Sequence, residues 1–199
     1  MIHTCISRTL HCDIDLHNLM VHYGDGNTVH GALIDFDLAS LEEPTCEYPY
    51  ERRTKARRFI PRELVKSATQ NFERFDWESF YYVLCWIGTH YSEGAEIKTI
   101  PLHFWNARDD DVLVKCKSAI LDGSIMAGSM TPSFITLFTD FYIPVYQSWI
   151  EPMQQMFQAA DRARSKFGAR KYSDDTLSFD EETVDGFITW ERVWDIIRN

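Results

Sequence analysis

The sequence predicts a mainly α-helical fold with one small β-hairpin near its N-terminal end. Two short apolar runs, residues 19–22 and 31–34, are separated by a segment rich in turn formers. From Phe75 onward, the apolar residues recur at helical spacing instead. We therefore expect strands first and helices later, in a chain whose 199 residues are enough to bury a core.

The predicted hairpin turns at residues 23–28, where the sequence Tyr-Gly-Asp-Gly-Asn-Thr is typical of a tight connection. Gly24 and Gly26 also match the start of a phosphate-binding loop. That interpretation needs a third glycine and a following helix, whereas a strand pattern follows here. The turn is therefore the favoured interpretation.

Helices account for most of the remaining fold. Phe75, Tyr82 and Trp86 fall near one face of a predicted helix over residues 75–87, and apolar neighbours widen that face. Such a helix is buried on most sides. Three further helices are expected, over residues 110–121, 132–142 and 146–166.

Two polar segments interrupt this helical pattern. Residues 41–58 contain two prolines and no apolar periodicity, which indicates a long surface loop. Residues 168–186 are polar and acidic, which indicates a flexible linker. Residues 187–197 then show helical apolar spacing, which indicates a docking helix. We therefore divide the chain into a domain over residues 1–167 and a polar tail over residues 168–199.

The formal net charge of −10, from 30 acidic and 20 basic residues, argues against a nucleic-acid or anionic-membrane partner. No apolar run is long enough to span a bilayer, and the first residues lack the apolar core of a signal peptide. The 5 cysteines are scattered and form no Cys-x-x-Cys pair, so disulfide and zinc frameworks are not expected. These features predict an intracellular location, in the cytoplasm or the nucleus.

The polar residues that flank the hairpin form the most informative pattern. His11, Asp13 and Asn18 precede the first strand, and Asp35 follows the second. An Asp and an Asn five positions apart, followed by a later Asp, is the order of a base and two magnesium ligands in phosphoryl transfer. Taken singly, Asp13 and Asn18 would be ordinary turn residues.

Four blocks of sequence resemble the C-terminal lobe of a protein kinase, and specifically the fungal-type protein kinase family. Residues 11–18 resemble the catalytic loop, and residues 32–39 resemble that family's magnesium-binding motif. Residues 53–64 resemble its variant of the Ala-Pro-Glu block, and residues 75–87 its central-helix signature. The resemblance covers roughly residues 8–165.

The resemblance implies a chemical role for three residues. Asp13 would be the catalytic base that accepts the proton of a protein Ser or Thr hydroxyl. Asn18 and Asp35 would supply oxygen ligands to the magnesium that accompanies ATP. The resemblance also implies a kinase-like C-lobe in which the hairpin carries both loops.

Three further residues would support the site structurally. His11 is expected to lie buried beneath the loop. Asp76 is expected to bond the backbone around His11 and Cys12, and it can also cap its own helix. Glu63 is expected to form an ion pair with an arginine of a later helix, and the sequence leaves the choice open among Arg162, Arg164 and Arg170.

The chain departs from the kinase pattern at several positions. Cys12 replaces the arginine that in many kinases holds a phosphorylated loop, and Asp15 stands where a Lys or Ser often contacts the phosphate. Ala56 replaces a Thr that braces the catalytic Asp, Lys55 replaces a Gly, and Pro61 replaces an Ala. Only ten residues precede the catalytic-loop block, so we expect the ATP-gripping N-terminal lobe to be missing. Binding of ATP and Mg²⁺, and the activity of the chain on its own, should then be weak.

Three functions remain open from the sequence. The first is a protein Ser/Thr kinase whose partners are a separate N-terminal lobe and a protein substrate. The second is a non-catalytic, pseudokinase-like binding module. The third is a small-molecule phosphotransferase, although residues 53–64 and 75–87 favour the protein-kinase branch. The basic run over residues 52–62 would suit an acidic peptide, but a solvated run that pairs with nearby glutamates is favoured.

Overall fold

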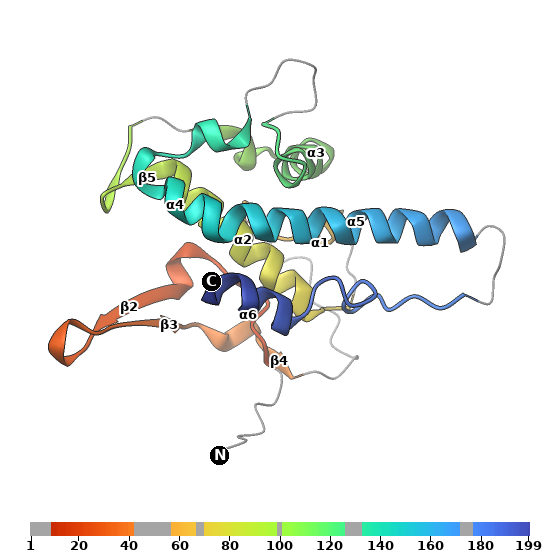
Figure 1. The fold of residues 1–199 in the computed structure, drawn as a ribbon, viewed down its shortest axis with the longest axis horizontal. Helices are drawn as coiled ribbons and strands as arrows, with labels where there is room; N and C mark the ends of the chain where they lie inside the picture. Colours follow the sequence, from red (N-terminus) through yellow and green to blue (C-terminus); the bar gives the residue numbers. More distant parts are fainter. Residues whose placement is uncertain (1–8, 42–56, 67–69, 99–100, 126–132, 172–176) are drawn as a thin grey trace. The chain divides into compact units, whose positions relative to one another are not determined.

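The fold is mainly helical, as expected, in a computed structural model that describes residues 9–41, 57–66, 70–98, 101–125, 133–171 and 177–199 (Figure 1). The chain divides into two compact units, residues 1–83 and residues 84–199. The predicted surface loop over residues 41–58 lies almost entirely outside the described residues.

The first unit contains two small antiparallel ladders. Strand β1 (Thr9–Leu10) pairs with β4 (Ser40–Leu41), and β2 (Leu19–Tyr23) pairs with β3 (Val29–Leu33). The β2–β3 pair is the expected hairpin, and it places Leu19 opposite Leu33. Gly26 in its turn takes a φ of 71°, a conformation that glycine adopts without a Cβ penalty.

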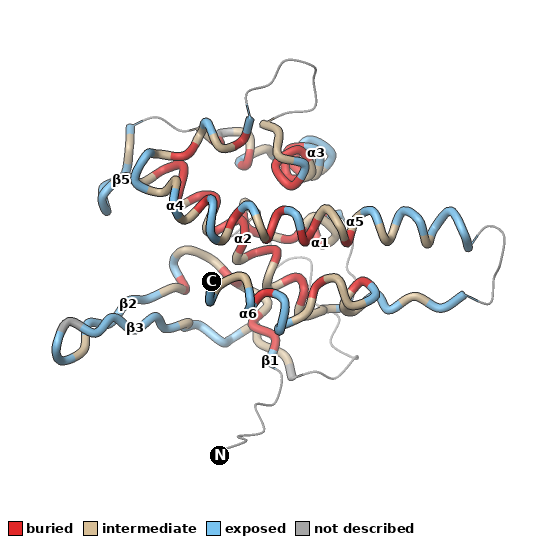
Figure 2. The backbone as a smooth tube through the Cα atoms, viewed as in Figure 1, coloured by how far each residue is buried: buried red, intermediate tan, exposed pale blue. Residues whose placement is uncertain are grey.

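The β2–β3 hairpin is exposed along most of its length (Figure 2). Tyr23 is 74% exposed and its cross-strand partner Val29 is 61% exposed. Isolated two-stranded hairpins are marginally stable in water. The two ends of this hairpin are instead fixed by hydrogen bonds to the loops described in the next subsection.

Helix α1 (Arg62–Lys66) and most of helix α2 (Glu73–His90) also belong to the first unit, whereas the last turns of α2 belong to the second. The predicted helix over residues 75–87 is therefore confirmed, with an extension at both ends. Tyr81, Tyr82 and Val83 are each 0% exposed, which agrees with an apolar surface wide enough to be buried on most sides.

The second unit contains the small hairpin of β5 (Tyr91–Ser92) and β6 (Ala95–Glu96), followed by α3 (Asp110–Leu121). The bounds of α3 are those predicted. Asp109 caps its start by accepting a bond from the Val112 N–H at 2.9 Å. Gly123 follows its end with a φ of 81°, which favours glycine.

The helix predicted over residues 132–142 is wrong. That stretch forms two short 3-10 turns, Phe134–Leu137 and Asp140–Tyr142, on either side of an extended backbone at Phe138 and Thr139. Thr139 is drawn out of helical geometry by tertiary bonds, because its N–H donates to the Gly88 carbonyl at 3.0 Å and its hydroxyl donates to the Tyr91 carbonyl at 2.7 Å. The spacing of the aromatic residues could not predict these tertiary bonds of Thr139.

The long helix predicted over residues 146–166 is present and extends further. It comprises α4 (Ile143–Val145), a π-helical segment at Tyr146–Ile150 and α5 (Glu151–Lys171). Pro152 lies at the start of α5 and has no N–H to offer the preceding turn, which accounts for the wider π geometry there. Met153 and Phe157 of α5 are 0% and 1% exposed and form part of the core of this unit.

The segment read from sequence as a flexible linker is ordered in part. Helix α5 continues to Lys171, and Val184 is only 2% exposed. The predicted docking helix is α6 (Trp190–Arg198), which contacts α5 and the π-helical segment. Its buried residue Val193 is 0% exposed. In the described part of the chain, no helix is both long enough and apolar enough to cross a bilayer.

Candidate active site

The loop that contains Asp13 is attached to helix α2 by one carboxylate. Asp76 accepts bonds from the His11 N–H at 2.6 Å and from the Cys12 N–H at 2.9 Å. Cys12 has a φ of 65°, an uncommon conformation for a residue with a side chain. The two bonds therefore offset a local backbone cost, and they are the contact expected of Asp76 from the sequence.

The side chain of Asn18 holds the loop closed around Asp13. Its Nδ2 donates to the Asp13 carbonyl oxygen at 2.9 Å and to the Asp13 Oδ2 at 3.3 Å. Asn18 is 8% exposed and ends a short 3-10 turn, Leu16–Asn18, which Asp15 caps. Because both bonds use the Asn18 amide nitrogen, its Oδ1 remains as an acceptor for another group.

The hairpin returns Asp35 to the same loop. The Ile34 N–H donates to the Asn18 carbonyl at 2.9 Å, and the His11 Nε2–H donates to the Ile34 carbonyl at 2.9 Å. Asp35 comes next in the chain, is exposed, and has a φ of 64°. The backbone just before Asp35 is thus bonded to the loop that contains Asp13 and Asn18, although Asp13 and Asp35 delimit a stretch of 23 residues in the sequence.

The surroundings of Asp13 favour its neutral form. Burial raises the pKa of its carboxyl above the ordinary value of 3.8, and the nearby charges of Asp15 and Asp35 raise it further. The hydrogen bond from Asn18 and the nearby His11 act in the opposite direction. A carboxylate with a raised pKa binds a proton more readily, which is the property of a general base.

The donor set at this place fits a hard divalent cation. The Oδ1 of Asn18 and the carboxylate of Asp35 are oxygen donors, and Mg²⁺ takes few protein oxygens together with phosphate oxygens and water. Among the described residues, no group of three or more His, Cys, Asp or Glu side chains is placed to hold a metal. A site built on Asn18 and Asp35 would therefore depend on the phosphates of a bound nucleotide.

A protein-family model matches part of the chain. Residues 4–88 match the family described as Fungal protein kinase. This segment is similar to the fungal protein kinase family. It contains every candidate site residue named so far. No curated protein and no solved structure matches the chain.

His11 has a structural place in the fungal kinase segment. It is 3% exposed, and its ring meets the ring of Phe36 edge-on at a centroid distance of 4.7 Å. Its Nδ1 accepts a bond from the Asp13 N–H at 3.3 Å, while its Nε2–H donates to Ile34. His11 thus joins the catalytic-loop block to the end of the hairpin.

Glu63 forms the expected ion pair, but with an arginine that the sequence did not indicate. The Arg74 guanidinium donates to both Glu63 carboxylate oxygens, at 2.6 and 2.9 Å. Arg74 belongs to the first turn of α2 and lies only 11 residues further along the chain. The choice among Arg162, Arg164 and Arg170 is therefore corrected, and Arg164 instead pairs with Glu181 at 3.0 Å.

The structure also accounts for some of the departures from the kinase pattern. Asp15 accepts bonds at its Oδ1 from the His17 N–H at 2.8 Å and from the His17 Nδ1–H at 2.7 Å. Its charge is thus held beside Asp13 by a histidine. Ala56 and Lys55 lie outside the described residues, and Pro61 is buried at the start of α1.

One supporting residue of the fungal kinase segment escaped the sequence analysis. Glu78 is 3% exposed and accepts bonds from Arg62 and Tyr82. A Glu within an otherwise apolar helix face was the available signal, because a buried carboxylate requires partners.

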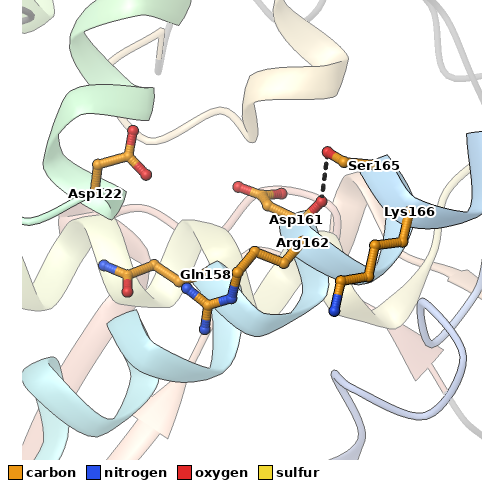
Figure 3. Close-up of a pocket in the computed structure, with 6 residues that line it drawn as sticks. All are labelled: Asp122, Gln158, Asp161, Arg162, Ser165 and Lys166. Atoms are coloured by element: carbon orange, nitrogen blue, oxygen red, sulfur yellow. Dashed lines mark hydrogen bonds between the residues drawn. The ribbon is translucent and has the colours of Figure 1, made fainter. Parts of the chain in front are cut away.

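The second unit has a cavity of its own, with a volume of about 450 Å³ (Figure 3). It is lined by two cationic, two anionic and two neutral polar side chains, namely Arg162, Lys166, Asp122, Asp161, Gln158 and Ser165. The charges of this lining balance, and the Ser165 hydroxyl donates to the Asp161 carbonyl of its own helix at 2.8 Å. The cavity therefore selects no class of ligand by charge.

Proposed function

We propose that this chain takes part in the ATP-dependent phosphorylation of protein Ser or Thr hydroxyls. Asp13 is the general base, and Asn18 and Asp35 are the magnesium ligands. The observation that carries the proposal is the double hydrogen bond of the Asn18 amide to Asp13, at 2.9 and 3.3 Å. It supports the proposal because the amide that bonds to the base through its nitrogen would offer its oxygen to the magnesium that accompanies ATP.

In this mechanism, Asp13 accepts the proton of the substrate hydroxyl while the hydroxyl oxygen bonds to the γ-phosphorus of ATP. The bond from that phosphorus to the bridging oxygen breaks, and ADP leaves. The Asn18 amide orients the Asp13 carboxylate, and Asp76 orients the loop that bears it. The raised pKa of Asp13 favours proton acceptance. Bound magnesium would supply positive charge that neutralises the phosphate oxygens.

A protein is the favoured phosphate acceptor because of residues 57–66. Their sequence belongs to the block that small-molecule phosphotransferases lack, and Glu63 and Arg62 fix them to α2. A flexible peptide needs such a fixed surface, because holding the acceptor in place supplies much of the rate of a two-substrate reaction.

The alternative is a non-catalytic binding module, and Asp15 is the observation that favours it. The negative charge of Asp15 contributes to the raised pKa of Asp13, so the two carboxylates interact. A carboxylate at this place repels an incoming phosphate and slows transfer.

The test uses the purified 199-residue chain with Mg²⁺, labelled ATP and a mixture of protein substrates. We expect slow transfer that falls at least about a hundredfold in Asp13→Asn, since general bases typically contribute that much. Asp35→Asn should also abolish magnesium-dependent ATP binding measured by calorimetry. The matched control is Asp37→Asn, an exposed aspartate of the same turn, which should behave as wild type.

Two results would contradict the proposal. Transfer that persists unchanged in Asp13→Asn would exclude Asp13 as the base. A wild-type chain with neither phosphate transfer nor magnesium-dependent ATP binding would support the binding-module alternative.

A further inference from the structure

The first turns of α2 bond to the start of helix α1 as well as to the loop that contains Asp13. Two residues after Asp76, Glu78 points its carboxylate at the start of α1. Its Oε1 accepts bonds from the Arg62 backbone N–H at 2.8 Å, from the Arg62 Nε–H at 3.2 Å and from the Tyr82 hydroxyl at 2.7 Å. Three donors thus converge on one oxygen of a side chain that is 3% exposed.

Each of these donors has a physical reason to bind Glu78. The Arg62 N–H is the first of helix α1 and belongs to the N–H groups that no residue of the same helix can satisfy. A carboxylate is a favourable acceptor for such a group. Burial and the Glu78 charge raise the pKa of Tyr82 well above its ordinary value, so its hydroxyl keeps the proton that it donates. The carboxylate is therefore anchored on its own helix while it holds the start of the next.

Helix α1 has a second attachment to α2. Arg74 is 4% exposed and binds both carboxylate oxygens of Glu63, while its guanidinium carbon lies 4.2 Å from the centroid of the Phe75 ring. In helix α2, Arg74 and Glu78 thus both hold α1, whereas Asp76 holds the catalytic-loop block.

We propose that Glu78 is a positioning residue that sets residues 57–66 at a fixed place relative to Asp13, for the benefit of the protein substrate. The inference rests on the proposed kinase function. It goes beyond that function by assigning different positioning roles to the neighbouring carboxylates of Asp76 and Glu78. Asp76 places the base, whereas Glu78 places the segment on which the substrate binds.

The first experiment measures amide hydrogen exchange in the full chain. Glu78→Gln keeps the shape of the side chain and removes its charge, so residues 59–66 should exchange about tenfold faster while residues 9–14 stay protected. Asp76→Asn should give the converse pattern. The control is Glu151→Gln, because Glu151 is an exposed glutamate in the first turn of α5. It should leave both segments as they are.

The second experiment measures kinetics. Glu78→Gln should raise the KM for the protein substrate about tenfold, because the acceptor is less well placed. The KM for ATP and the rate of ATP hydrolysis by water should not change, since neither uses residues 57–66. A purely structural role would instead raise both KM values and lower the rate of ATP hydrolysis together.

The outcomes separate this inference from the proposed function. A wild-type chain that transfers no phosphate contradicts the proposed function, while amide exchange still decides the role of Glu78. Unchanged exchange at residues 59–66 in Glu78→Gln, or equal loosening of both segments, would overturn the inference.

Discussion

Asp76 combines a buried position with two hydrogen bonds from backbone amides. Burial raises the pKa of its carboxyl from 3.8 to about 6, even though the bonds from His11 and Cys12 act in the opposite direction. The desolvation cost of the charge therefore exceeds the gain from those two bonds. A residue that organises the loop of Asp13 thus does so at a cost to the stability of the fold.

This cost predicts a pH dependence of stability. The folded chain binds the Asp76 proton more tightly than the unfolded chain, so this contribution to stability is fully present below about pH 4. It decreases as the pH rises through about 6, by about 3 kcal/mol in total, and levels off about one pH unit above that value. Urea unfolding of the wild type between pH 4 and 7.5 should show this slope.

Asp76→Asn should flatten that slope, because the replacement does not titrate. Asp140→Asn changes an exposed aspartate of the second unit in the same way and serves as its control. An unaltered slope in Asp76→Asn would show that other groups cause the pH dependence.

At the scale of elements, α6 shows what a short amphipathic helix gains from docking. It has 9 residues, too few to be stable alone in water, and it rests on α5 and the π-helical segment. Val193 is the residue that it buries completely, whereas Trp190 and Trp194 stack on each other at 5.3 Å and remain 46% and 42% exposed. Complete burial therefore makes Val193 a main attachment point of α6.

Val193→Ala should lower the free energy of unfolding by about 2 kcal/mol, from lost burial and the cavity that remains. Val112→Ala is the matched control, since Val112 is 46% exposed on α3. Its effect should stay within about 0.5 kcal/mol. Denaturant unfolding measures both, and equal losses would contradict the docking role of Val193.

At the scale of the whole molecule, charge is the dominant feature. The net charge is −10 and the isoelectric point is about 5.1. A surface with this excess of carboxylates repels polyanions at any distance shorter than the screening length. The basic residues at positions 52–62 are too few to reverse the sign for the chain as a whole.

We therefore predict that the chain does not bind duplex DNA or RNA. A gel-shift or fluorescence-anisotropy titration at about 50 mM salt, where phosphate contacts are strongest, should show no binding up to micromolar protein. The control for the assay is a basic DNA-binding protein of similar size. Binding that weakens with added salt would show that the basic run dominates the field of the molecule.

The sequence by itself determined the type of most elements and the identity of the candidate site. Local patterns are sufficient there: the turn at residues 23–28 defines the hairpin, apolar spacing defines α2, α3, α5 and α6, and residues 11–18 carry their motif within one loop. The hydrogen bonds of Asp76 to the backbone near His11, and the return of Asp35 to the loop of Asp13, were expected instead from the resemblance to a family.

Only the tertiary structure decided the partners of charged residues and the shape of segments that bond to distant backbone. Glu63 pairs with Arg74, and Glu78 accepts bonds from Arg62. Thr139 has an extended backbone and donates to the carbonyl groups of Gly88 and Tyr91. Each choice depends on which groups the fold brings within hydrogen-bond distance, and an ion pair or a single bond leaves no periodic mark in the sequence. Apolar periodicity is repeated many times along an element, whereas a specific contact occurs once, so only the former can be read without the fold.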